Sequence, residues 1–310
     1  MSDLRHNSRL ARALLLGAAV GDALGVPFEF RERGTFRVNG MTGHGTYNRP
    51  AGTWSDDTSL TLATADAICD GTVNLSKAAQ NFEDWLFAGR WTADGVVFDV
   101  GNGTRRAVER LANGCPPQKA GNSDVWSNGN GSLMRIAPLV VCLEHLEQSR
   151  RFDLVQQASS LTHRHPISIV GCILWCEMLL SVARGMSPAQ SCRAARSLGP
   201  ALAERLGKEA VQAYGRILEG DIGQLAIEDV LSDGYVVHTL EAALFCILTT
   251  HSYQEAVETA VNLGSDTDTT ACVTGAMAAL WYGEENIPAA WLATLRGREL
   301  IESTAEKMTA

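Results

Sequence analysis

Two clusters of acidic residues in this chain have hydroxyl residues beside them. One is the pair Asp56 and Asp57, which follows Ser55, and the other contains Asp266 and Asp268. Each precedes an apolar stretch, and Ser or Asp at a helix start commonly caps free N–H groups, so capping explains either cluster alone. Four carboxylates beside hydroxyl groups are also the oxygen ligands that Mg²⁺ and Mn²⁺ prefer. Together the two clusters predict a binuclear metal site.

Two further acids lie in the segment GDALGVPFE at residues 21–29. Asp22 ends an expected buried helix, and Glu29 follows an apolar turn. Periodicity alone favours a solvent-facing Glu29. Neither acidic cluster contains a His or Cys, which argues against zinc, because zinc sites use nitrogen and sulfur ligands.

The elements that must position these acids follow from apolar periodicity. Helices are expected over residues 10–23, 60–69, 78–87, 104–111, 134–146, 152–161, 167–183, 188–198, 201–218, 237–248, 253–263 and 269–281. Loops are expected over residues 34–52, 92–103 and 114–131. No strand alternation and no Pro/Ser-rich linker is evident. The sequence therefore predicts an all-α fold, a single compact multi-helix domain over residues 1–310 with the metal site in loops at helix ends.

Composition agrees with this fold and excludes some functions. Hydrophobic residues make up 45% of the 310 residues but aromatic residues only 6%, which suits closely packed helices. The formal net charge is −9. Nucleic acid is therefore not expected as the main partner, because phosphate backbones are bound through clustered Lys and Arg.

Cysteine usage and hydropathy bear on the cellular location. The eight cysteines include no CxxC pair, which favours free thiols in a reducing compartment. The first twelve residues are polar and charged, without a signal-peptide pattern. The most apolar run, at residues 166–183, contains Glu177 and is expected to be a buried helix and no membrane span. We expect a soluble, cytoplasmic protein.

Several segments, taken in order and with their spacing, resemble the ADP-ribosylglycohydrolase family, which includes the dinitrogenase-reductase-activating glycohydrolases and the ADP-ribosylarginine hydrolases. The segments are GAAVGDALG with Glu29 downstream, SDDT, FDVGNGT, NGNGSLMR, LTH, GYVVHTLEAA and GSDTDTT. Each is weak alone, but their order covers nearly the whole chain. The resemblance implies an all-α fold around a centre of two Mg²⁺ or Mn²⁺ ions.

The resemblance also implies roles for individual residues. The implied metal ligands are Ser55, Asp56, Asp57, Asp266, Asp268 and Thr269. The family usually has Thr where this chain has Ser55, a change that keeps the hydroxyl and loses a methyl group. Glu29 matches an acid at the metal centre that is widely assigned a catalytic role, and Asp99 matches an acid that faces the substrate ribose. Which of these two is the general acid or base stays open.

The substrate-binding residues implied by the resemblance are Asn102, Gly129, Asn130, Gly131, Ser132, Met134, His163 and Tyr235. Residues 129–132 match a diphosphate cradle, in which glycine lets backbone N–H groups approach phosphate and the helix expected from residue 134 adds its positive end. His163 matches the pocket histidine, and Tyr235 matches the residue that lies against the adenine. Without the resemblance, an ordinary Gly-rich turn and ordinary core or rim residues would be the simpler interpretation.

The function implied by the resemblance is hydrolysis of an N-glycosidic ADP-ribosyl bond in a modified protein, with ADP-ribose as the released product. The segment at residues 98–102 resembles the arginine-specific branch, so ADP-ribosyl-arginine is the expected substrate. Three alternatives stay open: another ADP-ribosyl linkage, to serine or to a small molecule; a catalytically silent ADP-ribose-binding protein; and a metal-dependent phosphoesterase. The intact acids argue against the silent protein, and the glycine motifs against the phosphoesterase.

Overall fold

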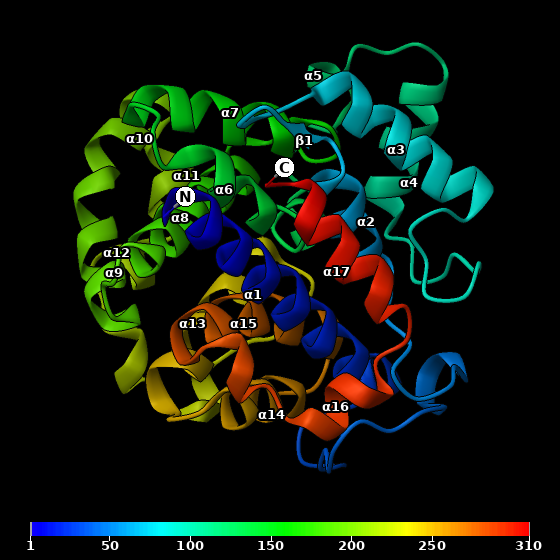
Figure 1. The fold of residues 1–310 in the computed structure, drawn as a ribbon. Helices are drawn as coiled ribbons and strands as arrows, with labels where there is room; N and C mark the ends of the chain where they lie inside the picture. Colours follow the sequence, from blue (N-terminus) through cyan, green and yellow to red (C-terminus); the bar gives the residue numbers. More distant parts are fainter. Residues whose placement is uncertain (1, 310) are drawn as a thin grey trace.

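Two helices from opposite ends of the chain, α1 (Ser2–Gly25) and α15 (Thr267–Tyr282), pack together at the centre of the molecule (Figure 1). The structure is a computed structural model that describes residues 2–309, with side chains from residue 7 to residue 309. Gly17, Gly21 and Gly25 share one face of α1, because residues four apart lie above one another on a helix. A Cβ atom at Gly21 would lie only 2.1 Å from the carbonyl oxygen of Ala271. The two backbones are therefore in direct contact.

The other helices surround this central pair. They are α2 (Asp56–Ala65), α3 (Leu75–Ala88), α4 (Asn102–Ala112), α5 (Pro117–Ala120), α6 (Val140–Leu143), α7 (Gln148–Ser160), α8 (Pro166–Ala183), α9 (Pro188–Ala195), α10 (Gly199–Leu206), α11 (Lys208–Gln212), α12 (Gly215–Leu218), α13 (Val236–Thr249), α14 (Tyr253–Asn262), α16 (Ala289–Thr294) and α17 (Arg298–Lys307). The only strands among residues 2–309 are β1 (Ile68–Cys69) and β2 (Thr72–Val73), an antiparallel hairpin. The predicted all-α fold in one compact domain is confirmed.

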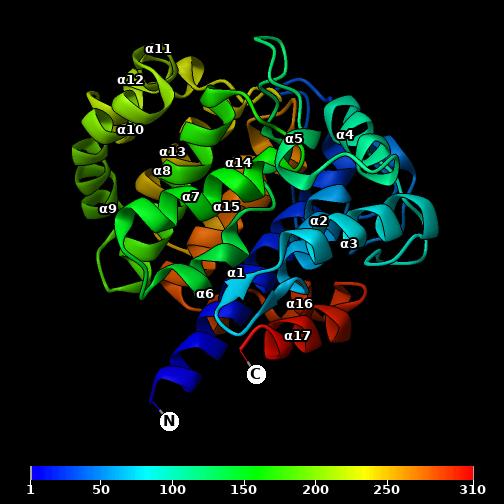
Figure 2. The same ribbon diagram turned by 90° about the horizontal axis from the view of Figure 1, so that it is seen from above.

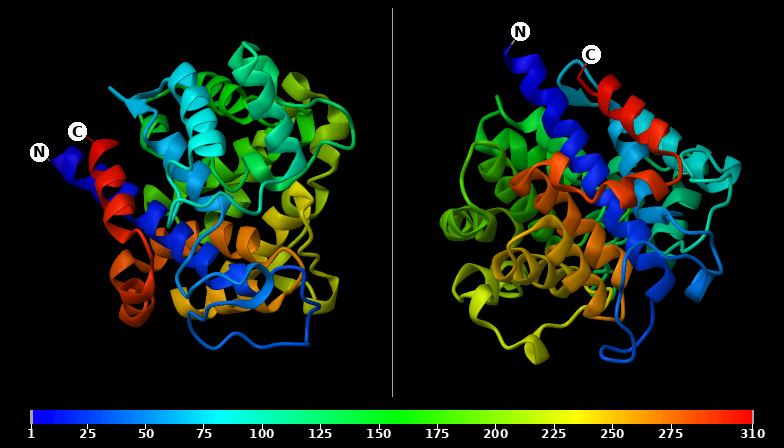
Figure 3. Two further views of the ribbon diagram at one scale, coloured as in Figure 1. Left: turned by 90° about the vertical axis from the view of Figure 1, so that its right-hand side faces the viewer. Right: turned by 60° about the horizontal axis from the view of Figure 1, so that its bottom comes forward.

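The helices form two groups on either side of α1. Seen from above, α7 to α12 lie on one side and α2 to α5 on the other (Figure 2). The long loop that follows α1 extends past the C-terminal end of that helix (Figure 3). This loop carries Glu29 and leads to α2, so it belongs to the part of the molecule where the acidic clusters meet.

Two predicted helices are interrupted in the structure, and the ends of others are shifted. The helix expected over 134–146 is wrong: residues 133–135 form a turn, Ala137–Leu139 is a 3₁₀ turn, and α6 is short. Pro138 lies inside the predicted span and lacks the N–H that a continuous helix needs. The helix expected over 201–218 is divided into α10, α11 and α12, with Gly207 at φ 94° after the first. The helix expected over 60–69 begins earlier, at Asp56, and ends at Ala65.

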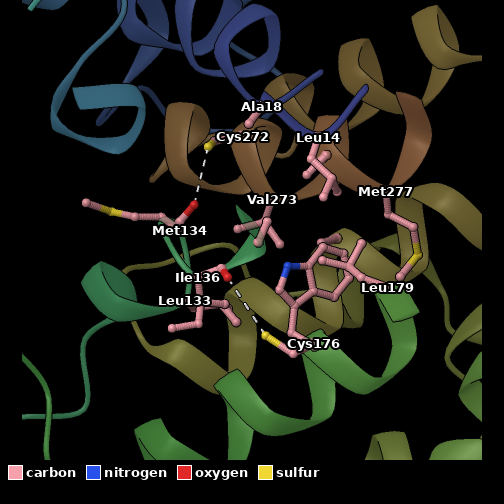
Figure 4. Packing of buried hydrophobic residues seen from close by; sticks show 14 of the residues in the cluster. Leu14, Ala18, Leu133, Met134, Ile136, Cys176, Leu179, Cys272, Val273 and Met277 are labelled. Atoms are coloured by element: carbon pink, nitrogen blue, oxygen red, sulfur yellow. Dashed lines mark hydrogen bonds between the residues drawn. The ribbon is translucent and has the colours of Figure 1, made fainter. Parts of the chain in front are cut away.

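Thiols help to hold the irregular segment around residue 134 inside the core (Figure 4). The Sγ of Cys272, on α15, donates to the carbonyl oxygen of Met134 at 3.8 Å, and the Sγ of Cys176, on α8, donates to that of Ile136 at 3.9 Å. These weak hydrogen bonds add to those that the same carbonyls accept from the hydroxyl of Thr61, at 3.3 Å, and from the N–H of Leu139, at 3.1 Å. All eight cysteines are free, as the sequence predicted.

Two segments, residues 7–28 and 166–183, are long and apolar enough to cross a membrane by length and composition. The fold buries 94% and 72% of their most apolar windows, respectively. Such burial is also found in core helices, and α1 and α8 are packed among other helices on several sides. The two segments are therefore weak evidence for a membrane span.

Candidate metal centre and ligand cavity

The two acidic clusters lie at the first turns of α2 and α15. Ser55 caps α2 by accepting a hydrogen bond from the N–H of Asp57 at 3.3 Å, and Asp266 caps α15 by accepting one from the N–H of Thr269 at 3.2 Å. The capping interpretation is therefore correct for one residue of each cluster. It does not account for Asp56, Asp57 or Asp268, whose carboxylates are also buried.

The carboxylates of both clusters meet in one place. Ligand oxygens lie within 4.8 Å of one another in three groups that share members: Asp22 with Asp57 and Asp268, Glu29 with Asp266 and Asp268, and Asp56 with Asp57 and Asp99. The structure thus brings together every acid that the sequence singled out. The hydroxyls of Ser55 and Thr269 lie 3.0 and 3.5 Å from the same Oδ2 of Asp57.

Several of these oxygens are buried without a partner. Among the described residues, Glu29 Oε2, Asp57 Oδ1 and Asp268 Oδ2 are shielded from solvent and accept no hydrogen bond. A buried carboxylate oxygen without a donor is costly, and a cation removes the cost. The donor set consists of carboxylate and hydroxyl oxygens only, which fits a hard dication such as Mg²⁺ or Mn²⁺.

Asp22 belongs to the same cluster but differs in its bonding. Its two oxygens accept hydrogen bonds from the N–H of Ser55 and from both the N–H and the hydroxyl of Thr58. These oxygens are already satisfied, so Asp22 holds the start of α2 in place. It lies in the last turn of α1, which continues to Gly25, and not at the helix end as expected.

Electrostatics in the cluster favour bound cations. Burial raises the pKa values of Asp56, Asp57 and Asp268 well above their ordinary range, and the neighbouring carboxylates raise them further. Burial, followed by the charge of Asp99, raises the pKa of Glu29 to about 9. The raised pKa values mean that the carboxylate charges are unfavourable where they lie, and a dication would reverse this effect.

Glu29 and Asp99 are held by loops with unusual backbone geometry. Phe30, Asp99 and Ser265 have φ values of 64°, 57° and 60°, in the left-handed region that non-glycine residues rarely adopt. The N–H of Phe30 donates to the carbonyl oxygen of Ser265 at 2.7 Å, which joins the Glu29 loop to the Asp266 loop. Glu29 is 6% exposed, so the solvent-facing position favoured by periodicity is wrong.

Tyr47, which the sequence analysis did not single out, orients Asp99. Its hydroxyl donates to Asp99 Oδ1 at 2.5 Å, and its ring packs against Phe98 with the centroids 5.1 Å apart. The loop at residues 34–52 carries Tyr47 and has no spacing signal that points to Asp99. Only the closure of this loop over the cluster brings the two residues together.

A cavity of about 430 Å³ opens beside the carboxylates. The residues that the sequence analysis placed in a site and that line this cavity are Glu29, Asp56, Asp99, Asn102, Gly129, Asn130, Gly131, Met134, His163, Asp266 and Thr269. The cavity therefore joins the acidic cluster to the glycine-rich segment at residues 129–131. Its lining also includes residues that the sequence analysis missed, among them Thr104, Arg106, Asn122 and Trp126.

Ser132 and Tyr235 do not line the cavity. Ser132 is fully buried behind it, where its hydroxyl accepts hydrogen bonds from Ser159 and from the thiol of Cys172. Tyr235 lies beside the cavity wall, since its backbone pairs with that of Gly129, but its ring packs edge-on against His238. The aromatic residues that line the cavity are instead Trp126, 92% exposed, and Phe30, 69% exposed.

Besides α2 and α15, α4 begins at the cavity, whereas residue 134 begins no helix. Gly101 precedes α4 without a side-chain cap, the first turn holds no acidic residue, and residues 101–104 line the cavity. The free N–H groups and positive end of this helix therefore favour an anion there. The side chain of Asn130 is directed toward the Asp266 cluster and not toward the start of α4. Its amide donates to Asp266 Oδ2 at 2.7 Å and to the hydroxyl of Thr239 at 2.9 Å.

Comparisons with known proteins agree with this arrangement. The family model for ADP-ribosylglycohydrolase matches residues 2–310. The chain is 32% identical to the ADP-ribosylarginine hydrolase Tri1 of Pseudomonas putida (strain GB-1), covering 96% of this chain and 77% of that protein. It is 30% identical to the ADP-ribosyl-(dinitrogen reductase) glycohydrolase of Rhodospirillum rubrum, covering 92% and 90%.

More distant relatives and a solved structure point the same way. The ADP-ribosylhydrolase ARH3 of Mus musculus is 25% identical, with 96% of this chain and 90% of that protein covered. A solved structure described as an ADP-ribosylglycohydrolase-related protein complex superposes with a TM-score of 0.80 at 31% identity, covering 98% of both chains. With its whole length matched and its carboxylates gathered at the starts of α2 and α15, the chain belongs to the ADP-ribosylglycohydrolase family.

Proposed function

We propose that this protein is a hydrolase that removes ADP-ribose from modified arginine side chains of proteins and releases free ADP-ribose. The observation that supports this most directly is the cavity in which the carboxylate cluster, the N-terminus of α4 and the glycine-rich segment converge. Among the relatives, the proteins near 30% identity are named as hydrolases of ADP-ribosyl-arginine and ADP-ribosyl-dinitrogen reductase, whereas ARH3 is at 25%.

We propose that two Mg²⁺ or Mn²⁺ ions bind at the start of α2 and α15. The residues that would hold them are Ser55, Asp56, Asp57, Asp266, Asp268 and Thr269. Bound dications supply Lewis acidity toward ribose oxygens and lower the pKa of water. The oxygens of Asp57 and Asp268 that lack any protein donor are the strongest support for ions at this position.

Glu29 and Asp99 would act on the bond that breaks. Both line the cavity and belong to the carboxylate cluster. Glu29 has one oxygen free of protein donors, so it can take a proton from the water that attacks the anomeric carbon or give one to the leaving nitrogen. Asp99 Oδ1 already accepts a hydrogen bond from Tyr47, which fixes the carboxylate and suits it to orient the ribose.

The rest of the ligand would follow the cavity away from the cluster. The diphosphate would lie between the N-terminus of α4 and the glycines at residues 129 and 131, where N–H donors are free. The adenine would lie at the mouth against Trp126, since an exposed indole offers a stacking surface and Tyr235 does not line the cavity. A cytoplasmic location, in which all eight thiols stay reduced, is part of the same proposal.

An arginine acceptor suits the charge of the site. A guanidinium leaving group is a planar cation that a carboxylate can hold through paired, charge-assisted hydrogen bonds, whereas a serine leaving group offers no such attraction. Serine linkage is the second candidate, and the test includes it.

The test offers the purified protein, with Mn²⁺, three substrate proteins that carry ADP-ribose on arginine, on serine or on glutamate, and follows loss of each label and release of ADP-ribose. Asp268→Asn serves as the inactive control. We expect ADP-ribose to be removed first from arginine, which leaves the arginine side chain unmodified. Preferential removal of ADP-ribose from serine would replace the substrate assignment, and release of phosphate or AMP in place of ADP-ribose would refute cleavage of the glycosidic bond.

A further inference from the structure

Arg135 is a fully buried cation that forms no ion pair within the described part of the chain. It is 0% exposed, and its Nε and Nη1 have no hydrogen-bond partner among the described residues. Its guanidinium lies over the ring of Phe82 at 4.8 Å, and its Nη2 donates to the carbonyl oxygen of Ala158 at 3.0 Å. A buried charge without a counter-ion is costly, so its position calls for an explanation beyond packing.

The remaining contact of Arg135 leads to the cavity. Its Nη2 donates to the hydroxyl of Thr162 at 2.7 Å, and this hydroxyl lies 3.0 Å from Nδ1 of His163. Thr162 is 0% exposed, and His163 is 5% exposed and lines the cavity. Arg135, Thr162 and His163 therefore form one hydrogen-bonded chain from the core to the cavity.

The direction of these hydrogen bonds follows from which groups can donate. A guanidinium only donates, so the Thr162 hydroxyl accepts from Arg135. The hydroxyl proton of Thr162 then needs an acceptor, and Nδ1 of His163 lies within hydrogen-bond distance of this hydroxyl. If Nδ1 carried a proton instead, the hydroxyl would accept twice and its own buried proton would have no partner. Nδ1 is therefore the acceptor.

The imidazole is neutral in this setting. Burial, and then the positive charge of Arg135, lower the pKa of His163 to about 3. Burial also lowers the pKa of Arg135, to about 10, which leaves the guanidinium charged near neutrality. A neutral imidazole whose Nδ1 accepts must carry its proton on Nε2.

Nε2 lies among the glycines that line the cavity. Cβ atoms added at Gly103, Gly129 and Gly131 would lie 3.3, 3.5 and 3.5 Å from it. Gly103 is in the first turn of α4, so the Nε2–H and the free N–H groups of that helix occupy the same part of the cavity. Several donors without a carboxylate among them suit a phosphate oxygen.

We propose that Arg135 and Thr162 are positioning residues that fix His163 as the Nε2–H tautomer, so that this N–H donates to a phosphate oxygen of the ADP-ribose diphosphate. The ligand part of this inference rests on the proposed function, whereas the tautomer does not. Arg135 also places a positive charge behind the wall that the diphosphate would contact, and burial reduces its screening by solvent.

The test reads the tautomer directly in full-length protein labelled with ¹⁵N-histidine. Two-bond ¹H–¹⁵N spectra at pH 7 distinguish Nε2–H from Nδ1–H, and His163→Gln identifies the signals of His163. The variants are Thr162→Val, which removes the hydroxyl, and Thr162→Ser, which keeps it. We expect the Nε2–H form in the wild type and in Thr162→Ser, and mixed or reversed tautomers in Thr162→Val. Loss of packing alone would not produce this pattern.

ADP-ribose affinity, measured by calorimetry, supplies the second readout. We expect Thr162→Ser to stay within about threefold of the wild type and Thr162→Val to bind about tenfold more weakly, the scale of one charge-assisted hydrogen bond. A wild-type His163 that is Nδ1–H or charged at pH 7, or a Thr162→Val that changes neither readout, would overturn the positioning role of Arg135 and Thr162. Failure of ADP-ribose to bind the wild type would refute the proposed function, and the spectra alone would then decide whether Thr162 fixes the tautomer.

Discussion

The carboxylate of Asp22, in the last turn of α1, accepts a 2.5 Å hydrogen bond from the hydroxyl of Thr58, in the first turn of α2. The N–H groups of Ser55 and Thr58 donate to the same carboxylate. A helix that is locked by backbone contact to α15 therefore also fixes the loop that begins α2. Both acidic clusters are thus positioned by one central helix.

This contact predicts the behaviour of Thr58→Val. The substitution keeps the shape of the side chain and removes one donor to a buried carboxylate, so the free energy of unfolding should fall by about 1.5–3 kcal/mol in urea titrations. Mn²⁺ affinity should fall with it, because α2 would no longer be held at its start. Thr58→Ser is the matched control and should keep most of the stability and most of the Mn²⁺ affinity. Equal stability of the two variants would contradict the role of the hydroxyl.

Removal of metal should destabilise the protein. Because dications bind the folded state and relieve repulsion among buried carboxylates, addition of Mn²⁺ at a hundredfold excess over Kd should raise Tm by roughly 5 °C relative to chelator. Asp268→Asn removes one buried charge, so in chelator it should be at least as stable as the wild type, yet it should gain nothing from Mn²⁺. Full activity in chelator, with metal-free protein verified by elemental analysis, would refute the metal centre.

Glu29→Gln should separate binding from turnover. The amide keeps the size of the side chain but cannot exchange a proton, so kcat should fall at least about a hundredfold while ADP-ribose affinity and the Mn²⁺-dependent rise in Tm persist. Glu32→Gln, an exposed change three residues away, is the control and should leave kcat unchanged. Normal turnover by Glu29→Gln would assign the proton transfer to Asp99 or to water.

His163 should make stability depend on pH. Its pKa in the folded protein is lowered from 6.5 to about 3, chiefly by burial, so the unfolded chain binds a proton that the folded protein does not. Stability from this group is present above pH 6.5 and is lost as the pH falls toward 3. Between pH 7 and pH 5 the loss should be about 2 kcal/mol.

Urea titrations across this pH range check that loss. The difference in unfolding free energy between the wild type and His163→Gln should shrink by about 2 kcal/mol from pH 7 to pH 5. The surface substitution His251→Gln should show no such change relative to the wild type. A constant difference between the wild type and His163→Gln would mean that folding does not lower the pKa of His163.

The contact between α1 and α15 should not tolerate a side chain. A Cβ at Gly21 would lie 2.1 Å from the carbonyl oxygen of Ala271, so Gly21→Ala must push the two helices apart and should cost roughly 2–4 kcal/mol of stability. Gly199→Ala is the matched control, because nothing lies within 4 Å of that position and its backbone is helical. It should be neutral or slightly stabilising.

The sequence predicted the long apolar helices and the set of acids, because both are local signals. Hydropathy alone predicts that α1 and α8 are buried, and the clusters of hydroxyl and acidic residues mark the starts of helices. The helix expected over 134–146 was wrong because Pro138 interrupts it, and because the segment around residue 134 makes contacts with distant helices, the thiols of α15 and α8 among them, which periodicity cannot reveal.

The parts of the site that the sequence did not predict depend on contacts between distant loops. Burial of Glu29 follows from the link between Phe30 and Ser265, and the orientation of Asp99 follows from Tyr47. A helix start at the cavity was predicted at residue 134, but α4 begins there instead. The loop before α4 carries Asp99 and brings the start of this helix to the cavity. Trp126 lies in a predicted loop, and loop residues give no periodic signal for the surface they face.

The pairing of α1 with α15 also sets an order of events during synthesis. Asp57 and Thr269, whose side chains meet in the carboxylate cluster, are 212 positions apart, so a ribosome delivers one long before the other. Until α15 has emerged, the glycine face of α1 has no partner, and Asp56 and Asp57 lie apart from Asp266 and Asp268. Closing so long a chain segment is also slow. Metal loading can therefore only follow synthesis and folding of α15, and a nascent chain that stalls before residue 266 would carry only the Asp56 and Asp57 half of the binding site.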